Sequence, residues 1–257
     1  MNILHSLILG LVEGLTEFLP ISSTFHLIIT SKILGLNSNE FLKLFEVVIQ
    51  SGAIFALLFI YAKTLWNDRR LLLNVIYSFI PTAIVGFVLH KIIKTVFFES
   101  NWLMLTVFIL MGFVFLLLEK YIGKLDKDCT KLSTRDAIII GLAQATSVIP
   151  GVSRSGSIIV AMMMLGYKRE EAAKYTFLLS LPTIFSATAL DLIGSRSLLF
   201  SQVGGWELLL VGTLTSLVVG YLVVKWLTNY LATHTLRVFG WYRLSIASLL
   251  IAFKVLP

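Results

Sequence analysis

Long apolar stretches alternate with short polar breaks along the whole chain. Six of these stretches are uninterrupted and close to the roughly 20 residues that an α-helix needs to cross the hydrocarbon core of a membrane. They predict six transmembrane helices, which we place at residues 40–62, 71–91, 102–121, 170–193, 206–227 and 238–256. The pattern is typical of an all-α integral membrane protein.

Two further apolar stretches, at about 2–35 and 135–166, are each interrupted by a proline and a group of Ser, Gly and charged residues. The first break contains Pro20 and the second contains Pro150. Proline removes a backbone donor and clashes with the preceding turn of a helix. We therefore expect each stretch to form two half-helices that enter and leave the membrane on the same side, as a re-entrant hairpin.

The composition agrees with a membrane location, because 57% of the residues are hydrophobic and only 14% are charged. The net charge of +7 comes from residues scattered over short loops, which favours membrane lipids as partners and argues against nucleic acid. Most Lys and Arg residues fall on one side of the predicted topology, among them Lys63, Lys127 and Arg243. That side is expected to be cytoplasmic, with both termini outside. The single cysteine, Cys129, is expected in a loop and excludes an internal disulfide.

The two broken stretches are related in sequence. When the second half of the chain is laid on the first, Pro20 aligns with Pro150 and Ser23 aligns with Ser153. The match falls on the helix breaks, which chance similarity between apolar segments would not favour.

These matches predict a single membrane domain, 1–257, made of two repeats at about 1–125 and 131–257. Each repeat contains one hairpin and three spans, and an odd number of crossings inverts the second repeat relative to the first. Inverted repeats bring their helix breaks together near the midplane, where the binding site forms.

Two carboxylates lie in the first half-helix. Glu13 and Glu17 are four residues apart, so both project from one face, and Glu13 aligns with Gln144 after one residue of slip. Such a pair is costly in a bilayer unless it binds a cation, shares a proton or meets an arginine. We expect a site for a divalent cation, Mg²⁺ or Ca²⁺, or for a proton. The alternative is an interfacial hairpin with protonated or water-facing glutamates.

Three hydroxyl residues, Ser22, Ser23 and Thr24, follow the first break, and His26 comes next. One of the serines is expected to cap the second half-helix. A helix N-terminus also offers free N–H groups and a positive dipole to a phosphate, and a histidine supplies a general acid or base. The segment therefore predicts phosphate binding with acid–base chemistry beside it.

The second break places one guanidinium among hydroxyls and glycine, at Ser153, Arg154, Ser155 and Gly156. Arginine binds phosphate oxygens through two parallel hydrogen bonds, and glycine lets a ligand approach the backbone. A phosphate-binding break is the functional interpretation. The alternative is that Arg154 only neutralises a glutamate of the first break across the repeat interface.

Together, the residues at 13–26 (EGLTEFLPISSTFH) and 150–156 (PGVSRSG) resemble the two signature motifs of the BacA/UppP family of undecaprenyl-diphosphate phosphatases. The segments at 45–50, 177–182 and 187–191 are similar to further family segments, so the likeness covers nearly the whole chain. It implies a plasma (inner) membrane enzyme that removes the terminal phosphate of a polyprenyl diphosphate, recycles the cell-wall lipid carrier and confers bacitracin resistance.

The resemblance also implies roles for the site residues. It makes Glu13 and Glu17 the acidic pair, Ser23 a proposed nucleophile, His26 the catalytic histidine, and Ser153, Arg154 and Ser155 phosphate contacts. Arg154 and a cation on the acidic pair are expected to stabilise the charge on the transferred phosphoryl group. Either Ser23 attacks with His26 as base, or a water attacks with the same base.

Two positions depart from the family pattern. Phe25 stands where the family usually has Gly, and Ile158 stands where a Thr usually follows the second motif. Both remove polarity or space beside the expected phosphate. Restoring Gly and Thr is therefore expected to raise catalytic efficiency, unless the bulky pair suits another prenyl phosphate.

A second class of function is compatible with the same residues. Inverted repeats with broken helices are also found in secondary transporters. The alternative is a transporter or flippase of a polyprenyl phosphate or another anionic substrate at the same midplane site. The sequence leaves open whether copies of the chain form a homo-oligomer.

Overall fold

The computed structural model describes residues 1–92, 100–194 and 204–254, and over these ranges the regular structure is helical apart from one isolated bridge between Lys127 and Tyr167. The α-helices are α1 (Ile3–Thr16), α2 (Ser23–Ile33), α3 (Glu40–Asn67), α4 (Arg69–Ile92), α5 (Asn101–Tyr121), α6 (Thr134–Ala145), α7 (Arg154–Met164), α8 (Arg169–Gly194), α10 (Gly205–Thr233) and α11 (Arg237–Ala252). Two short 3-10 turns, η2 (Cys129–Lys131) and η3 (Thr146–Val148), precede and follow α6.

Five of these helices, α3, α4, α5, α8 and α10, are long and apolar enough to cross a membrane. Each coincides with one of the predicted spans. The helix at the sixth predicted span, α11, has 16 residues, and residues 255–256 of that prediction lie outside the described part of the chain. The fold is therefore that of an all-helical, multi-pass membrane protein.

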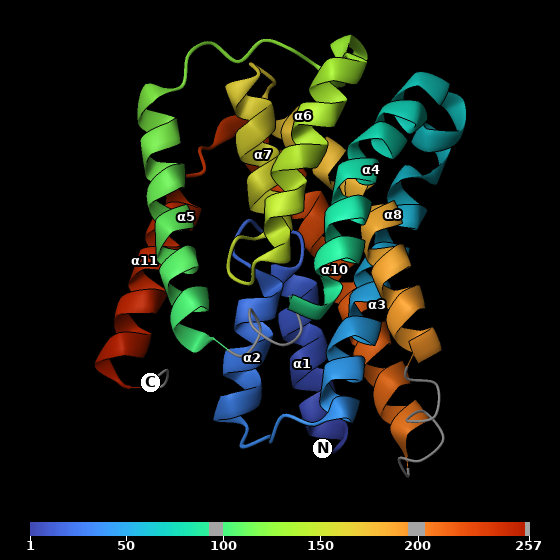
Figure 1. Cartoon of the computed structure of the whole chain (residues 1–257), viewed down its shortest axis with the longest axis vertical. Helices are drawn as coiled ribbons and strands as arrows, with labels where there is room; N and C mark the ends of the chain where they lie inside the picture. Colours follow the sequence, from blue (N-terminus) through green and yellow to red (C-terminus); the bar gives the residue numbers. More distant parts are fainter. Residues whose placement is uncertain (93–99, 195–203, 255–257) are drawn as a thin grey trace.

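Both predicted helix breaks are present. Helices α1 and α2 lie in the lower half of the bundle, and α6 and α7 lie in the upper half (Figure 1). The turns within the two pairs meet in the middle, where the Ser155 hydroxyl donates to the Leu19 carbonyl oxygen at 2.9 Å. The N-terminus and the last turn of α11 lie in the lower half of the bundle (Figure 1). The polar breaks of the two halves therefore share one location inside the bundle.

The two pairs have the same local geometry. Helices α2 and α7 each have 11 residues, and the serines that precede them, Ser22 and Ser153, have positive φ angles of 68° and 73°. The structural partner of Ser153 is therefore Ser22 and not Ser23, the serine that the sequence alignment paired with it. A serine in this backbone region is strained, so the surroundings must hold it there.

Packing between the halves is reciprocal and close. Helix α1 packs along α10, and α6 packs along α4. A Cβ atom on Gly10 would lie 2.5 Å from the carbonyl oxygen of Gly212, and one on Gly141 would lie 2.2 Å from that of Ser78. Small residues at these crossings let the helix backbones approach. They fix α1 and α6, and with them the two breaks.

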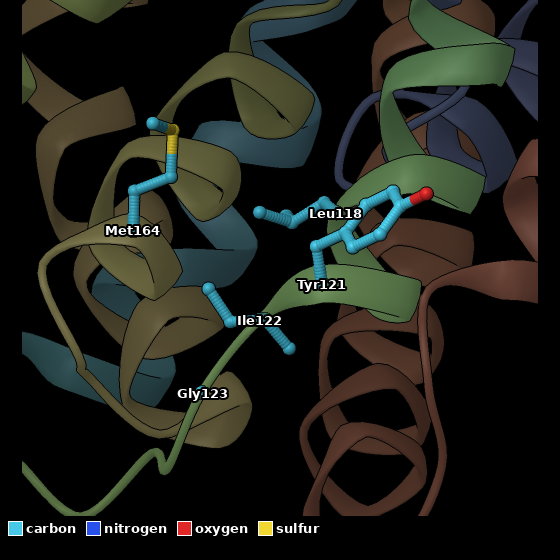
Figure 2. A pocket seen from close by; sticks show the side chains of 5 residues that line it. All are labelled: Leu118, Tyr121, Ile122, Gly123 and Met164. Atoms are coloured by element: carbon cyan, nitrogen blue, oxygen red, sulfur yellow. The ribbon is translucent and has the colours of Figure 1, made fainter.

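An open apolar hollow of about 280 Å³ lies near the upper ends of α5 and α7. It is lined by Leu118, Tyr121, Ile122, Gly123 and Met164. Figure 2 shows Leu118 of α5 pointing towards the side of the hollow where Met164, the last residue of α7, lies, with the Tyr121 ring turned away from it. None of the predicted site residues lines this hollow.

Candidate active site

An ion pair joins the two helix breaks. Glu17 follows α1 directly, Arg154 begins α7, and Arg154 Nη2 donates to Glu17 Oε1. The side chain of Arg154 is 13% exposed and that of Glu17 is 5% exposed. The hydroxyl of Ser23 donates to the second carboxylate oxygen, Glu17 Oε2. Three of the predicted site residues are thus in mutual contact through one carboxylate.

The second carboxylate, Glu13, has a different environment. It is fully buried, and neither of its carboxylate oxygens accepts a hydrogen bond from a donor within the described part of the chain, while the Glu17 carboxylate is close enough to interact with it. The aligned residue of the second half, Gln144, donates to Thr82 Oγ1 at 2.7 Å and accepts from Thr183 Oγ1 at 3.4 Å. A buried carboxylate without a donor is unfavourable unless it is protonated or binds a cation. Of the two aligned residues, Glu13 lacks a hydrogen-bond donor, whereas Gln144 is hydrogen-bonded.

The carboxylates of Glu13 and Glu17 could hold a cation only if water or substrate supplied the remaining ligands. No group of three or more His, Cys, Asp or Glu side chains among the described residues is arranged to hold a metal ion. Mg²⁺ is commonly bound by one or two carboxylates, with water and substrate phosphate as the remaining ligands. Glu13 offers two carboxylate oxygens without a donor, whereas those of Glu17 are engaged by Arg154 and Ser23 and become available only when these contacts break.

The hydroxyls of the second break hold its own structure. Ser153 Oγ accepts from the Gly156 backbone N–H at 3.2 Å, which caps α7, and it lies 3.0 Å from Ser155 Oγ. In contrast, the Nε atom of Arg154 is buried without a hydrogen-bond partner among the described residues. The N-terminal turn of α7 therefore presents an unused guanidinium donor next to a helix dipole.

The ring nitrogens of His26 contact other groups than the Glu17 cluster. Its Nδ1 atom lies 2.8 Å from the Ser22 carbonyl oxygen, and its Nε2 atom lies 2.8 Å from the hydroxyl of Tyr242 on α11. Among the contacts of the described residues, none joins His26 to Ser23 or Glu17. Thr24 is partly buried in the first turn of α2. A direct Ser23–His26 pair is thus not part of this structure.

Arg243 was predicted on the cytoplasmic face, and this placement is wrong. The residue lies in α11 and is fully buried. Its guanidinium donates to the carbonyl oxygens of Pro20 at 2.9 Å, Gly151 at 2.9 Å and Val152 at 3.3 Å. Arg243 therefore joins the backbones of both breaks, at residues one or two positions before the strained serines Ser22 and Ser153.

Sequence reasoning missed this residue although a signal existed. Arg243 lies five residues inside the span predicted at 238–256, and a charge within an apolar span marks a functional or structural site. The Arg243 guanidinium also lies over the rings of Phe108 and Phe115, at 4.7 and 5.3 Å from their centroids. Cation–π contacts and carbonyl acceptors together replace water around the charge.

The two positions that depart from the family pattern lie in apolar surroundings. Phe25 is 1% exposed and stacks on Phe108 of α5, with ring centroids 4.0 Å apart. Ile158 is fully buried in the main hydrophobic core. Both side chains fill space between helices, which changes the expected effect of reverting them.

Comparisons with known proteins agree over nearly the whole chain. Residues 6–249 match the family model described as bacitracin resistance protein BacA. The chain is 42% identical to an undecaprenyl-diphosphatase of Aquifex aeolicus, with 97% of each chain covered. It is 40% identical to that of Persephonella marina, with 98% of this chain and 99% of the relative covered. It is 39% identical to that of Thermus thermophilus, with 95% and 94% covered.

Proposed function

Because this chain belongs to the BacA family of bacitracin resistance proteins, we propose that it is an undecaprenyl-diphosphatase. The reaction hydrolyses undecaprenyl diphosphate to undecaprenyl phosphate and inorganic phosphate, which recycles the cell-wall lipid carrier and gives bacitracin resistance. The structural observation that carries the proposal is the contact of Arg154 with the Glu17–Ser23 pair, where two helix breaks meet inside an apolar bundle. A phosphate site needs such donors, and a lipid substrate needs the apolar surroundings.

The proposed membrane arrangement follows from the same geometry. The pairs α1–α2 and α6–α7 are re-entrant hairpins from opposite sides, and α11 is the sixth span of an inverted repeat with halves 1–125 and 131–257. The opposed positions of the pairs (Figure 1) and the reciprocal packing of α1 on α10 and α6 on α4 support it. Basic loops such as that of Lys127 support a cytoplasmic upper end, with both termini outside the plasma (inner) membrane.

In the proposed mechanism, Arg154 exchanges partners when the substrate binds. Its guanidinium leaves Glu17 and forks onto oxygens of the terminal phosphate, while the N-terminal turn of α7 adds backbone donors. Phosphoryl transfer depends mainly on positioning and on stabilising charge at the transferred group. Ser22, Thr24, Ser153, Ser155 and Gly156 form the walls of this proposed phosphate site.

The release of Glu17 from Arg154 frees a proton acceptor next to Ser23. In one route Ser23 attacks the terminal phosphorus, the bond to the bridging oxygen breaks, undecaprenyl phosphate leaves, and water then hydrolyses the phosphoserine to inorganic phosphate. In the other route Ser23 orients a water that attacks the same phosphorus, and undecaprenyl phosphate and inorganic phosphate leave in one step. In both routes Glu17 is the proton acceptor already in contact with the Ser23 hydroxyl. His26 lies three residues further along the same face of α2 and is the second acid–base group of the site. A divalent cation, Mg²⁺ or Ca²⁺, held by Glu13 and Glu17 would supply positive charge to the diphosphate oxygens.

Phosphate release from a C55 or C15 prenyl diphosphate by the purified protein in detergent, with and without a chelator, tests the proposal. We expect release by the wild-type chain and its loss in Arg154→Ala. The same fold arrangement occurs in transporters, so the second candidate function is movement of a prenyl phosphate. Transport without hydrolysis requires a sealed membrane, and a wild-type protein that moves the lipid in vesicles but releases no phosphate would replace the enzyme proposal.

A further inference from the structure

His26 has one nitrogen fixed by the backbone and one held by a side chain from the far end of the sequence. Nδ1 lies 2.8 Å from the Ser22 carbonyl oxygen, which can only accept a hydrogen bond. Nδ1 therefore carries a proton in both the neutral and the charged ring. All proton exchange of His26 takes place at Nε2.

The partner of that nitrogen is the hydroxyl of Tyr242, at 2.8 Å. A phenol both donates and accepts, so it donates to Nε2 of the neutral ring and accepts from the Nε2–H of the charged ring. The two rings are nearly parallel, with an interplanar angle of 18° and centroids 5.7 Å apart. The contact thus persists through a full protonation cycle of His26.

Tyr242 is itself held in place by its neighbour. Arg243, the next residue of α11, donates to carbonyl oxygens of both helix breaks. The turn of α11 that bears Tyr242 is therefore anchored to the same backbone segments that hold Glu17 and Arg154. Phe108 closes a third side of the His26 ring, with an edge contact at 5.9 Å between centroids.

We propose that Tyr242 is a positioning residue for the reaction, which holds Nε2 of His26 and passes protons to and from that nitrogen through its hydroxyl, giving up one proton as it takes up another. The expected effect on kcat rests on the proposed function, whereas the contact between His26 and Tyr242 is independent of it. It differs from a general aromatic role at a membrane interface, because such a role would need the ring of Tyr242 and not its hydroxyl.

The variant Tyr242→Phe removes the hydroxyl and keeps the ring. We expect kcat for a prenyl diphosphate to fall about ten-fold or more, since a positioned acid or base contributes 10²–10⁴-fold in rate. We expect KM and the thermal midpoint to stay close to wild type, because Tyr242 is 37% exposed and Phe preserves its packing. The matched control is Tyr230→Phe, which alters another tyrosine stacked on a histidine, His234, with centroids 4.3 Å apart.

A spectroscopic measurement tests the contact without any turnover. In protein labelled with ¹⁵N-histidine, the His26 signals are assigned by their absence in His26→Gln. We expect Tyr242→Phe to move the Nε2 resonance towards that of an unbonded nitrogen, and Tyr230→Phe to leave it unchanged.

An unmoved Nε2 resonance would overturn the proposal, and so would a moved resonance with kcat within two-fold of wild type. A wild-type protein that releases no phosphate would instead contradict the proposed function, and the resonance would still report on the Tyr242 contact. A fall in kcat together with a moved resonance is the result that the proposal requires.

Discussion

The guanidinium of Arg154 and the carboxylate of Glu17 form a largely buried ion pair between residues 137 positions apart in the sequence. Each residue belongs to a different helix break, and each has a further task in the proposed reaction. The pair keeps two costly charges neutral inside the bundle until a phosphate provides a competing partner. The resting structure therefore favours exchange of Arg154 between carboxylate and substrate.

Replacing Arg154 tests this exchange. We expect Arg154→Lys to lose at least about ten-fold in kcat/KM, because an ammonium cannot form two parallel bonds to phosphate and bonds to charged groups contribute about 1.5–3 kcal/mol. The measurement is phosphate release from a prenyl diphosphate in detergent, with Lys174→Arg, at a partly buried lysine of α8, as the control. Near-normal efficiency in Arg154→Lys would exclude a two-bond phosphate role.

Glu13 is the test of cation binding. We expect Glu13→Gln to weaken the apparent affinity for Mg²⁺ or Ca²⁺ at least about ten-fold, because the variant removes an ionised ligand. In chelator its thermal midpoint should equal or exceed that of wild type, since an amide avoids a buried unpaired charge. The control is Glu46→Gln, which alters a carboxylate of α3 that accepts from Ser31 at 3.1 Å. Identical metal titrations of wild type and Glu13→Gln would remove the cation assignment.

Arg243 is expected to matter for both stability and turnover. In Arg243→Met the carbonyl oxygens of Pro20, Gly151 and Val152 lose their donor, and each buried unpaired group costs about 1–3 kcal/mol. We expect a lower thermal midpoint and a lower kcat, with partial recovery in Arg243→Lys. Arg237→Lys, at the first residue of α11, is the control and should behave as wild type. An Arg243→Met protein with unchanged stability would show that the breaks do not depend on this clamp.

The structure reverses the expectation for the double reversion Phe25→Gly with Ile158→Thr. Both side chains are buried in apolar contacts, and removal of the Phe25 ring leaves a cavity against Phe108. Deletion of a buried phenyl group typically costs about 3–5 kcal/mol, and glycine adds flexibility within α2. We expect a lower thermal midpoint and no gain in kcat/KM. A reverted protein that is as stable as wild type and faster would restore the sequence-based interpretation.

Cys129 lies in the loop between α5 and α6 and should react slowly. Burial and the nearby Glu171 carboxylate raise the pKa of the Cys129 thiol, so less thiolate, the reactive form, is present near neutral pH. The measurement is the rate of maleimide labelling at pH 7.5. Wild type is compared with the double variant Cys129→Ser/Thr130→Cys, which moves the thiol to the exposed neighbouring position. We expect the moved thiol to react faster and the wild-type rate to rise with pH. Equal rates would mean that the Cys129 thiol is freely exposed.

The sequence by itself determined the helices and the places where they break. Apolar stretches of spanning length fix α3, α4, α5, α8 and α10, because hydropathy is a property of consecutive residues. Pro20 and Pro150 fix the two breaks for an equally local reason, the loss of a backbone donor. The sequence also indicates Glu17 and Arg154 as site residues, because a charge within an apolar stretch needs a partner.

Only the tertiary structure decided which partners these residues meet. The contact of His26 with Tyr242 joins residues 216 positions apart, and that of Arg243 with Pro20 joins residues 223 positions apart. Neither follows from a local pattern, because both depend on how α11 approaches the two breaks. For the same reason the packing of Phe25 against Phe108 of α5 does not follow from the sequence around Phe25. Local chemistry selects the residues of a site, whereas helix packing sets their distances and therefore their roles.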